Sequence, residues 1–369
     1  MKKTLMTILV SGLMFASCSK QETTDNPLLQ KWDTPFETAP FEKIKVEHYL
    51  PAFEAAMEEH NKEIQAIIDN AEAPTFDNTI AALDYAGETL SKVAGVFFNM
   101  MAANTSEELQ KVNEQVGPMM ATHSDNISMN AKLFEKIKAV YDAKDSQKYT
   151  GEQLALLEKT YNKFVRSGAL LDAAKQEELR KVNAELTKVE AKFDANLLKE
   201  SKAYQLVIDK EENLKGLPQG EIEKAAALAK EKGQEGKWIF TLDNPSFMPF
   251  VTYADNRDLR KEIFNARVNR CNNGGETDNN ALVAQMSELR AKKAQLLGYE
   301  TFAHYQLEER MAKEPKAVFD LLENLLSYSV KVAKEEAAQF QAMLSKDVPG
   351  AKLEAWDMYY YAEKVRQQK

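Results

Sequence analysis

The four histidines are the first residues to test for chemistry, because a catalytic zinc site needs closely spaced histidines. His48, His60, His123 and His304 stand outside any His-Glu-x-x-His motif, in which two histidines one helical turn apart bind zinc beside a glutamate base. His304 and Glu308 are four residues apart. That spacing suits an ordinary pair on one helix face better than a metal site, which needs further ligands. We therefore predict no metal ligand and no catalytic residue among these 369 residues.

Arginines gather on one predicted helix, where Arg257, Arg260, Arg267 and Arg270 follow Asn256. Arg260 and Arg267 are seven residues apart and share a helix face. Because a guanidinium binds a carboxylate through two parallel hydrogen bonds, these two residues are candidates for contact with a substrate carboxylate. A solvated face or an ion pair between helices is the alternative that we favour, since runs of charge usually have that role.

Cysteine occurs only at positions 18 and 271. Cys271 has no histidine nearby in the sequence, which favours a buried structural thiol over a nucleophile. The glycines lack the Lys-Ser/Thr ending of a phosphate-binding loop, and no Gly-x-Ser-x-Gly elbow is present. The sequence thus offers no alternative set of catalytic groups.

The first residues have the pattern of an export signal. Lys2 and Lys3 precede a short apolar stretch, and Ala16-Ser17-Cys18 follows it. This order is similar to that of a bacterial lipoprotein signal, in which Cys18 is lipidated and becomes the mature amino terminus; an ordinary secretory signal is the alternative. We predict a signal peptide at 1–17, a polar tether at 18–27 and a fold at 28–369. The protein would then be lipid-anchored in the cell envelope, on the periplasmic or the surface side.

The composition excludes several classes of protein. Glycine (14) and proline (11) are scarce, which argues against the many turns of a β-sandwich or barrel. Lys and Arg number 48 against 57 Asp and Glu, so the net charge is −9 and a nucleic-acid partner is not expected.

Nearly everything after residue 45 has helical periodicity, with apolar residues three and four positions apart. We expect Pro74 to end the first helix and Asp77 to cap the next, which carries residues 80–97. Thr105-x-x-Glu108 and Thr150-x-x-Gln153 have the capping-box pattern, and Asp172 precedes a long amphipathic run.

The segments 203–208 and 237–242 instead alternate apolar and polar residues, and we expect them to pair as a two-stranded ribbon around a short helical piece. Helix is then predicted from Pro245 to Cys271, interrupted by a turn at 272–275, and again over 278–297, 301–311, 315–344 and 353–369. The predicted fold class is all-α: an elongated multi-helix array with one small two-stranded β ribbon.

Several short motifs together resemble the dipeptidyl carboxypeptidases, which are zinc metallopeptidases of the thimet-oligopeptidase-like family. The motifs cover the chain after the tether and are Asn26-Pro27-Leu28-Leu29, Pro40-Phe41-Glu42-Lys43-Ile44, Thr75-Phe76-Asp77-Asn78-Thr79, Leu296-Leu297-Gly298-Tyr299 and Trp356-Asp357-x-Tyr359-Tyr360. Each motif is weak alone, but their order along the chain makes the resemblance specific.

The resemblance implies a helical half that lines one wall of a deep channel admitting short peptides. In that family the zinc ligands and the base follow the Trp-Asp-x-Tyr-Tyr region, so the resemblance transfers no catalytic residue to this chain. Zinc would be bound by the carboxy-terminal catalytic half, which is also the expected partner. We therefore expect the amino-terminal part of an exported dipeptidyl carboxypeptidase, inactive alone. The alternative is a self-standing helical lipoprotein that binds peptides or partners without catalysis.

Overall fold

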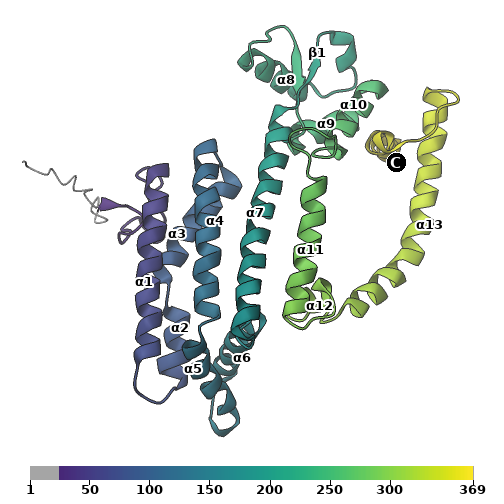
Figure 1. The fold of residues 1–369 in the computed structure, drawn as a ribbon. Coiled ribbons are helices and arrows are strands. Elements are labelled where there is room, and N and C mark those ends of the chain that lie inside the picture. Colours follow the sequence, from purple (N-terminus) through teal and green to yellow (C-terminus); the bar gives the residue numbers. More distant parts are fainter. Residues whose placement is uncertain (1–24, 369) are drawn as a thin grey trace, which may run out of the picture. The chain divides into compact units, whose positions relative to one another are not determined.

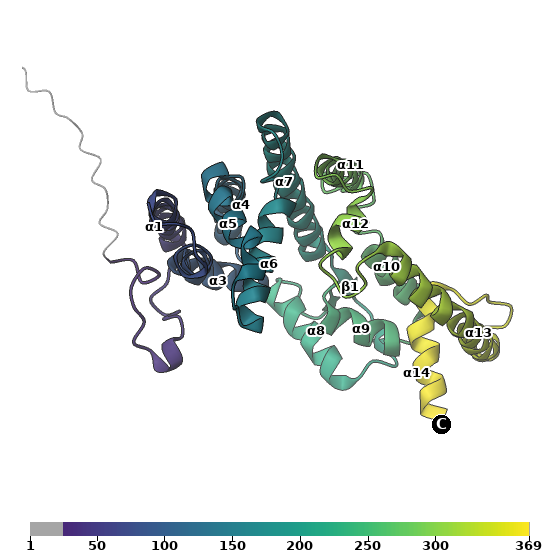
Figure 2. The ribbon, with the colours of Figure 1, turned by 90° about the horizontal axis from the view of Figure 1, so that it is seen from below.

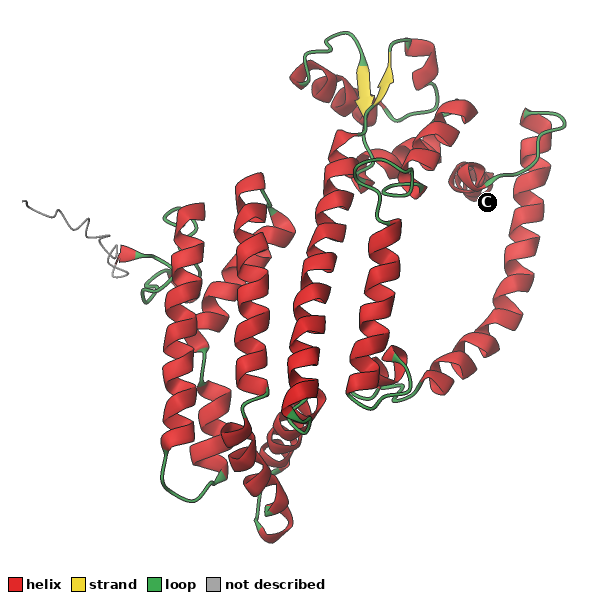
Figure 3. Ribbon diagram, viewed as in Figure 1, coloured by secondary structure: helices red, strands yellow, loops and turns green. Residues whose placement is uncertain are grey.

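The structure is a computed structural model that describes residues 25–368. Cys18 and the predicted signal peptide lie outside the described residues. The chain divides into two compact units, residues 1–116 and 117–369, which are treated separately below. Figure 3 shows that the described part is built almost wholly from helices, with a single two-stranded sheet. The predicted fold class, all-α with one small ribbon, is confirmed.

The first unit packs its helices around aromatic side chains. Its elements are α1 (Tyr49–Asp69), α2 (Ala82–Tyr85), α3 (Glu88–Ala103) and the start of α4 (Glu107–Ser128). Phe97 of α3 meets Phe53 of α1 edge to face at 5.4 Å between ring centroids, and Tyr49 at 5.0 Å. Asn26, at the end of the predicted tether, donates a hydrogen bond to the carbonyl of His48, and Leu28 is fully buried.

Two predicted helix caps in this unit are wrong. The cap after Pro74 is Thr75, whose hydroxyl accepts from the backbone N–H of Asn78, and not Asp77. The helix expected over residues 80–97 is also broken, because Gly87 adopts a left-handed φ of 80° ahead of α3. At the start of α4, Ser106 and not Thr105 accepts from the backbone N–H of Leu109.

The second unit contains the remaining α-helices and both strands, in this order: α5 (Ala131–Asp142), α6 (Gly151–Arg166), α7 (Ala173–Ala203), β1 (Leu206–Ile208), α8 (Gln219–Glu231), β2 (Trp238–Phe240), α9 (Asn244–Tyr253), α10 (Arg257–Val268), α11 (Asn280–Leu296), α12 (Phe302–Leu307), α13 (Pro315–Asp347) and α14 (Met358–Gln368). The predicted capping box at Thr150 and the cap at Asp172 are both present, at the starts of α6 and α7. Figures 1 and 2 show the long helices α7 and α11 side by side.

The predicted pairing of the two segments is confirmed, with three residues in each strand. The ribbon is antiparallel, with Leu206 opposite Phe240 and Ile208 opposite Trp238. Its inner residues join a core with α9 and α10 that includes the fully buried Phe250 and Ile263. A two-stranded ribbon is marginal alone, so this helical backing stabilises it.

The helix expected from Pro245 to Cys271 is in fact two helices. Chain direction changes after Tyr253, and Asn256 then caps α10 by accepting from the N–H groups of Asp258 and Leu259. The prediction of one continuous helix is wrong here because the short side chain of asparagine accepts well from the free N–H groups at a helix start.

The last helices follow the prediction with shifted ends. The segment predicted over 301–311 is helical only as far as Leu307, and the one predicted from 353 begins with a 3₁₀ turn at Ala355–Asp357 before α14. Among residues 25–368, none of the helices combines the length and apolar character that crossing a membrane requires.

Candidate functional site

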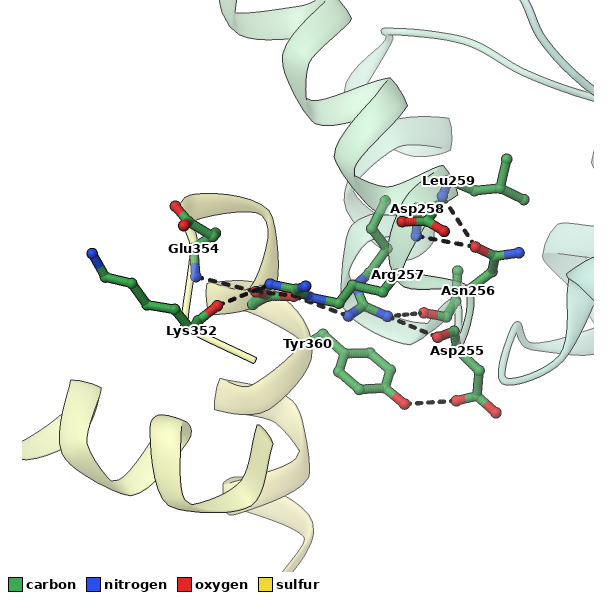
Figure 4. Close-up of polar contacts among 11 residues, drawn as sticks. Asp255, Asn256, Arg257, Asp258, Leu259, Lys352, Glu354 and Tyr360 are labelled. Carbon is green, nitrogen blue, oxygen red and sulfur yellow. Dashed lines mark hydrogen bonds and ion pairs between the residues drawn. The ribbon is translucent and has the colours of Figure 1, made fainter. Parts of the chain in front are cut away.

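The arginine-rich start of α10 faces the 3₁₀ turn that precedes α14 (Figure 4). Asn256 fixes the first turn of α10, and this places Arg257 and Arg260 toward Asp357. Arg257 donates from Nε to Oδ1 of Asp357 at 3.0 Å and from Nη2 to Oδ2 at 2.7 Å. Arg260 donates from Nη2 to the same Oδ1 at 3.2 Å. One carboxylate is therefore shared by two guanidinium groups.

The pair between Arg260 and Asp357 is buried, with side-chain exposures of 1% and 0%. Arg260 also donates to the backbone carbonyls of Ala254 and Asp255, and its guanidinium lies 3.9 Å from the ring centroid of Tyr360. The Tyr360 hydroxyl in turn donates to the Asp255 carboxylate at 2.7 Å, as Figure 4 shows. These contacts join the segment before α10 to α14 through a buried arginine and a partly exposed carboxylate, that of Asp255.

The protonation states in this cluster follow from burial and charge. Burial alone would raise the pKa of Asp357, but hydrogen bonds from Arg257 and the backbone of Glu354 hold that pKa below its usual value. The same contact raises the pKa of Arg257. Burial and the hydrogen bond to Asp255 raise the pKa of Tyr360. These shifts favour an ionised Asp357 beside a charged Arg257 and a neutral Tyr360, a set suited to holding structure together.

Arg267, the second candidate for substrate contact, is engaged elsewhere. Its Nη1 donates to the carbonyl of Leu242 at 2.5 Å and its Nη2 to Oδ1 of Asn244 at 2.6 Å. The guanidinium also stacks over the ring of Phe247, 4.3 Å from the centroid. Arg267 thus fixes the connection between β2 and α9, while Arg260 holds α14. Arg260 thus forms an ion pair between elements, as in the alternative given above, and contact of Arg260 or Arg267 with a substrate carboxylate stays a prediction.

A second polar cluster joins the end of α6 to α12. Arg166 donates a hydrogen bond from Nη1 to the carboxylate of Glu308, and another from Nη2 to the carbonyl of Tyr305 at 2.7 Å. The hydroxyl of Tyr299 donates to the same Glu308 carboxylate at 2.6 Å. Burial opposes charge on Glu308, but the Tyr299 and Arg166 contacts prevail and lower its pKa, while burial and Glu308 raise the pKa of Tyr299 to about 12.

This cluster corrects the predicted pairing of His304 with Glu308. Glu308 points to Arg166, and His304 instead contacts the hydroxyl of Thr301 at 2.9 Å and lies 3.7 Å from Glu300. Across residues 25–368, no group of three or more His, Cys, Asp or Glu side chains is placed to hold a metal ion. Within this described part, the donor side chains therefore do not form a set that fits a zinc centre.

Cys271 is buried, with 5% of its surface exposed, in agreement with a structural thiol. Its backbone N–H donates to Glu200 of α7 at 2.9 Å, and Asn273 and Thr277 donate to the same carboxylate at 2.6 and 2.7 Å. Glu200 thus organises the Asn-Gly turn that follows α10. Burial and the nearby Glu200 raise the pKa of the Cys271 thiol, so the reactive thiolate is disfavoured.

Sequence reasoning missed the residues that organise these clusters, which are Arg166, Glu200 and Asp357. Asp357 did carry a signal, since it belongs to the Trp-Asp-x-Tyr-Tyr motif that suggested the family. Arg166 and Glu200 lie in charged helical stretches that look like any solvated face.

A family profile and the curated relatives of this chain point to the same family of proteins. Residues 250–369 match the sequence profile of Peptidase family M3. The chain is 34% identical over 347 residues to the dipeptidyl carboxypeptidase of Escherichia coli (strain K12), which covers 94% of this chain and 51% of that protein. It is also 34% identical over 344 residues to the dipeptidyl carboxypeptidase of Salmonella typhimurium and 29% identical over 349 residues to oligopeptidase A of Escherichia coli.

The chain spans about half the length of the curated relatives it matches. These matches confirm the resemblance to the M3 peptidases and to their dipeptidyl carboxypeptidase branch.

Proposed function

We propose that this relative of the M3 peptidases is the amino-terminal, substrate-channel half of an exported dipeptidyl carboxypeptidase. The observation that carries the proposal is the extent of the match. Similarity runs through 94% of this chain but only 51% of the Escherichia coli enzyme, and the 369 residues contain no His-Glu-x-x-His. The proposal assigns the hydrolytic groups to the half of the relatives that this chain does not match.

In the proposed enzyme, zinc is held by that other half and supplies an activated water. The residues of this chain have a different role: they build one wall of a deep channel that admits short, unfolded peptides. The ion pairs on Asp357 and Glu308 support this role, because each joins helices that are far apart in the sequence. The Asp357 carboxylate is fully buried, whereas the Glu308 side chain is 51% exposed. Dipeptides would leave from the carboxyl ends of the peptide substrates.

The first test is an activity assay. Hydrolysis at zinc requires about three protein ligands and a base around one water, and this chain does not offer them. We expect the purified chain, supplied with zinc, to leave a blocked tripeptide uncut. The proposal that the hydrolytic groups lie in the other half would be overturned by turnover that a chelator abolishes and that persists after repurification.

The second test is complementation with the catalytic half. The unmatched half of the Escherichia coli relative is produced separately and mixed with this chain, with each half alone as the control. Dipeptide release only in the mixture would support the channel-wall function. Activity of the catalytic half that is unchanged by this chain would favour the alternative, a helical lipoprotein that binds peptides or partners without catalysis.

A third test uses the gene. Coding sequence for His-Glu-x-x-His immediately downstream, in any reading frame, supports an interrupted or incomplete gene for a dipeptidyl carboxypeptidase. Its absence favours the self-standing lipoprotein. The export and lipid anchor in the proposal rest on Lys2, Lys3 and the Ala16-Ser17-Cys18 sequence, and on the polar residues that follow.

A further inference from the structure

The middle of helix α13 is exposed on every side. Each residue from Phe319 to Glu336 is exposed, a stretch of about five helical turns at 3.6 residues per turn. Large apolar side chains are frequent there, and their exposed fractions are as follows: Phe319 61%, Leu321 59%, Leu322 54%, Leu325 51%, Leu326 58%, Tyr328 72%, Val330 40% and Val332 51%. Figure 1 shows this stretch as the bowed central part of the helix.

The two ends of the same helix are packed. Near the carboxyl end, Phe340 and Leu344 are buried against Tyr360 and Tyr361 of α14. At the amino end, α13 follows and contacts α12. The helix is therefore anchored at both ends, and the exposure is confined to its middle. Because helices in proteins draw most of their stability from packing an apolar face, the exposed part is expected to have a tertiary partner.

The apolar residues occupy two sides of the helix. At 100° per residue, Phe319, Leu322, Leu326 and Val330 form one row, and a second row lies about 135° around the axis. The second row consists of Leu321, Leu325, Tyr328 and Val332. The two rows and the residues between them span an arc of about 200°, twice the width of about 100° that a helix on a protein surface normally buries.

The remaining face is polar and charged. Lys316 and Asp320 form an ion pair at 2.6 Å on it, and Glu323, Lys331 and Lys334 continue the same face. A helix with one narrow polar side and a wide apolar arc is typical of an element that inserts between two layers, with only its charged edge reaching water.

The exposed area matches a stable interface. Half exposure of eight large side chains leaves on the order of 600 Å² of apolar surface in water, above the few hundred Å² usual for a soluble monomer. It approaches the roughly 800 Å² that one partner buries in a stable protein–protein interface.

We propose that the middle of α13 is the docking element for the unmatched half of the M3-type enzyme, which encloses both apolar rows. This inference rests on the proposed function for the identity of the occupant. Two observations favour that occupant over a second copy of this chain. The family match covers residues 250–369 and so includes all of α13, yet the chain spans only about half of its relatives. A symmetric contact between two copies of one helix would cover a single row and leave the other in water.

The experiment uses two paired substitutions, one on each row. Leu322→Gln with Leu326→Gln alters the first row, and Leu321→Gln with Leu325→Gln alters the second. The matched control is Leu170→Gln, because Leu170 is exposed to 60%, close to the 58% of Leu326, but lies outside α13. All four leucines of α13 are exposed, so the variants should keep the helical circular dichroism of the parent.

Binding to the separately produced carboxy-terminal half of the Escherichia coli dipeptidyl carboxypeptidase is measured by sedimentation velocity. A single-chain fusion of residues 25–369 to that half is examined in parallel by hydrogen exchange. We expect a one-to-one complex and at least tenfold weaker binding for each paired variant, with the control within twofold of the parent. In the fusion, amides of 319–336 should exchange at least tenfold more slowly than in the chain alone.

The other outcomes overturn the proposal in distinguishable ways. If one paired variant binds as the parent does, α13 is not enclosed on both sides. If the parent forms dimers that either paired variant disrupts, the occupant is a second copy. Absence of both binding and protection removes the docking function of α13. Loss of binding in the variants without dipeptide release by the parent complex would retain the docking surface and reject the proposed function instead.

Discussion

Replacing Asp357 with asparagine is the most direct test of how this chain holds its last helix. The carboxylate is fully buried and is shared by Arg257 and Arg260, whose side chains are 29% and 1% exposed. Asparagine keeps the size of the side chain but loses the charge and one acceptor. The substitution therefore leaves two guanidinium groups without their counter-ion, and Arg260 has no access to solvent to compensate.

The magnitude follows from the burial. Removing one partner of a buried ion pair typically costs about 3–5 kcal/mol, because the remaining charge stays buried and uncompensated. The backbone N–H of Glu354 also donates to Asp357 at 3.1 Å, and this bond survives if the amide oxygen of asparagine faces it. We therefore expect the lower end of the range, about 3 kcal/mol, which corresponds to roughly a hundredfold change in an opening equilibrium.

Hydrogen exchange measured by mass spectrometry is the suitable assay, because a chain with two compact units need not unfold in a single step. Peptides that cover α10 and α14 should exchange roughly a hundredfold faster in Asp357→Asn, while those from α1 and α3 should be unchanged. Asp320→Asn is the control, since it breaks an ion pair whose side chains are 72% and 60% exposed. That exposed pair should contribute less than about 0.5 kcal/mol.

Equal exchange of α10 and α14 in the parent and in Asp357→Asn would refute the reasoning. It would mean that the two arginines find other partners or water at no cost, and that the buried ion pair does not hold α14. Faster exchange throughout the chain would also contradict it, because the effect would then not be local to this cluster.

The remaining predictions concern pH, the backbone, the thiol and the anchor. Because folding lowers the pKa of Asp357 from its usual 3.8, its stabilising contribution is complete above about pH 4 and is lost as the pH falls through the folded value; protection of α14 should fall there in the parent but not in Asp357→Asn. Gly216→Ala should destabilise the second unit by about 1–3 kcal/mol in urea titrations, because Gly216 has a φ of 89° and a new Cβ would overlap the carbonyl of Tyr253. Cys271 should react with a thiol reagent at least tenfold more slowly in the native chain than in denaturant, because it is buried and its thiolate is disfavoured. Cys18→Ala should shift the expressed protein from the membrane fraction to the soluble one, and equal fractionation of the variant and the parent would contradict the lipid anchor.

The elements of the fold could be predicted because their signals are local. Apolar residues at helical spacing, the caps at Thr150 and Asp172, and the alternation in the two ribbon strands depend on neighbours a few residues away. The two helix caps that were predicted wrongly also depend on local sequence. Thr75 competes with Asp77, and Ser106 with Thr105, so a rule based on residue type locates the helix start only to within one or two positions.

The partners of the charged side chains could not be predicted, because they depend on contacts across roughly a hundred residues of sequence. Arg257 and Asp357 form one such long-range pair, and Arg166 and Glu308 form another. The charge pattern of a helix does not show which charged residues contact a neighbouring helix and which are solvated. The motif Trp-Asp-x-Tyr-Tyr was informative only through family resemblance, and the structure adds a physical reason for it. Asp357 accepts hydrogen bonds from two arginines, and the ring of Tyr360 lies against one of them.

Most of the second unit pairs its charged groups and buries its apolar groups, but the middle of α13 does not. In the second unit, the buried Arg260 donates to a carboxylate and to carbonyl oxygens, and the ribbon is covered by helices. Residues 319–336 of α13 are the contrast, since they combine helical order with large apolar side chains in water. Folding alone gives no reason to place two apolar rows on one exposed helix, because burying them would stabilise the chain. A partner that encloses the helix does give one, and for that reason the paired leucine variants test the assembly while the Asp357 variant tests the fold.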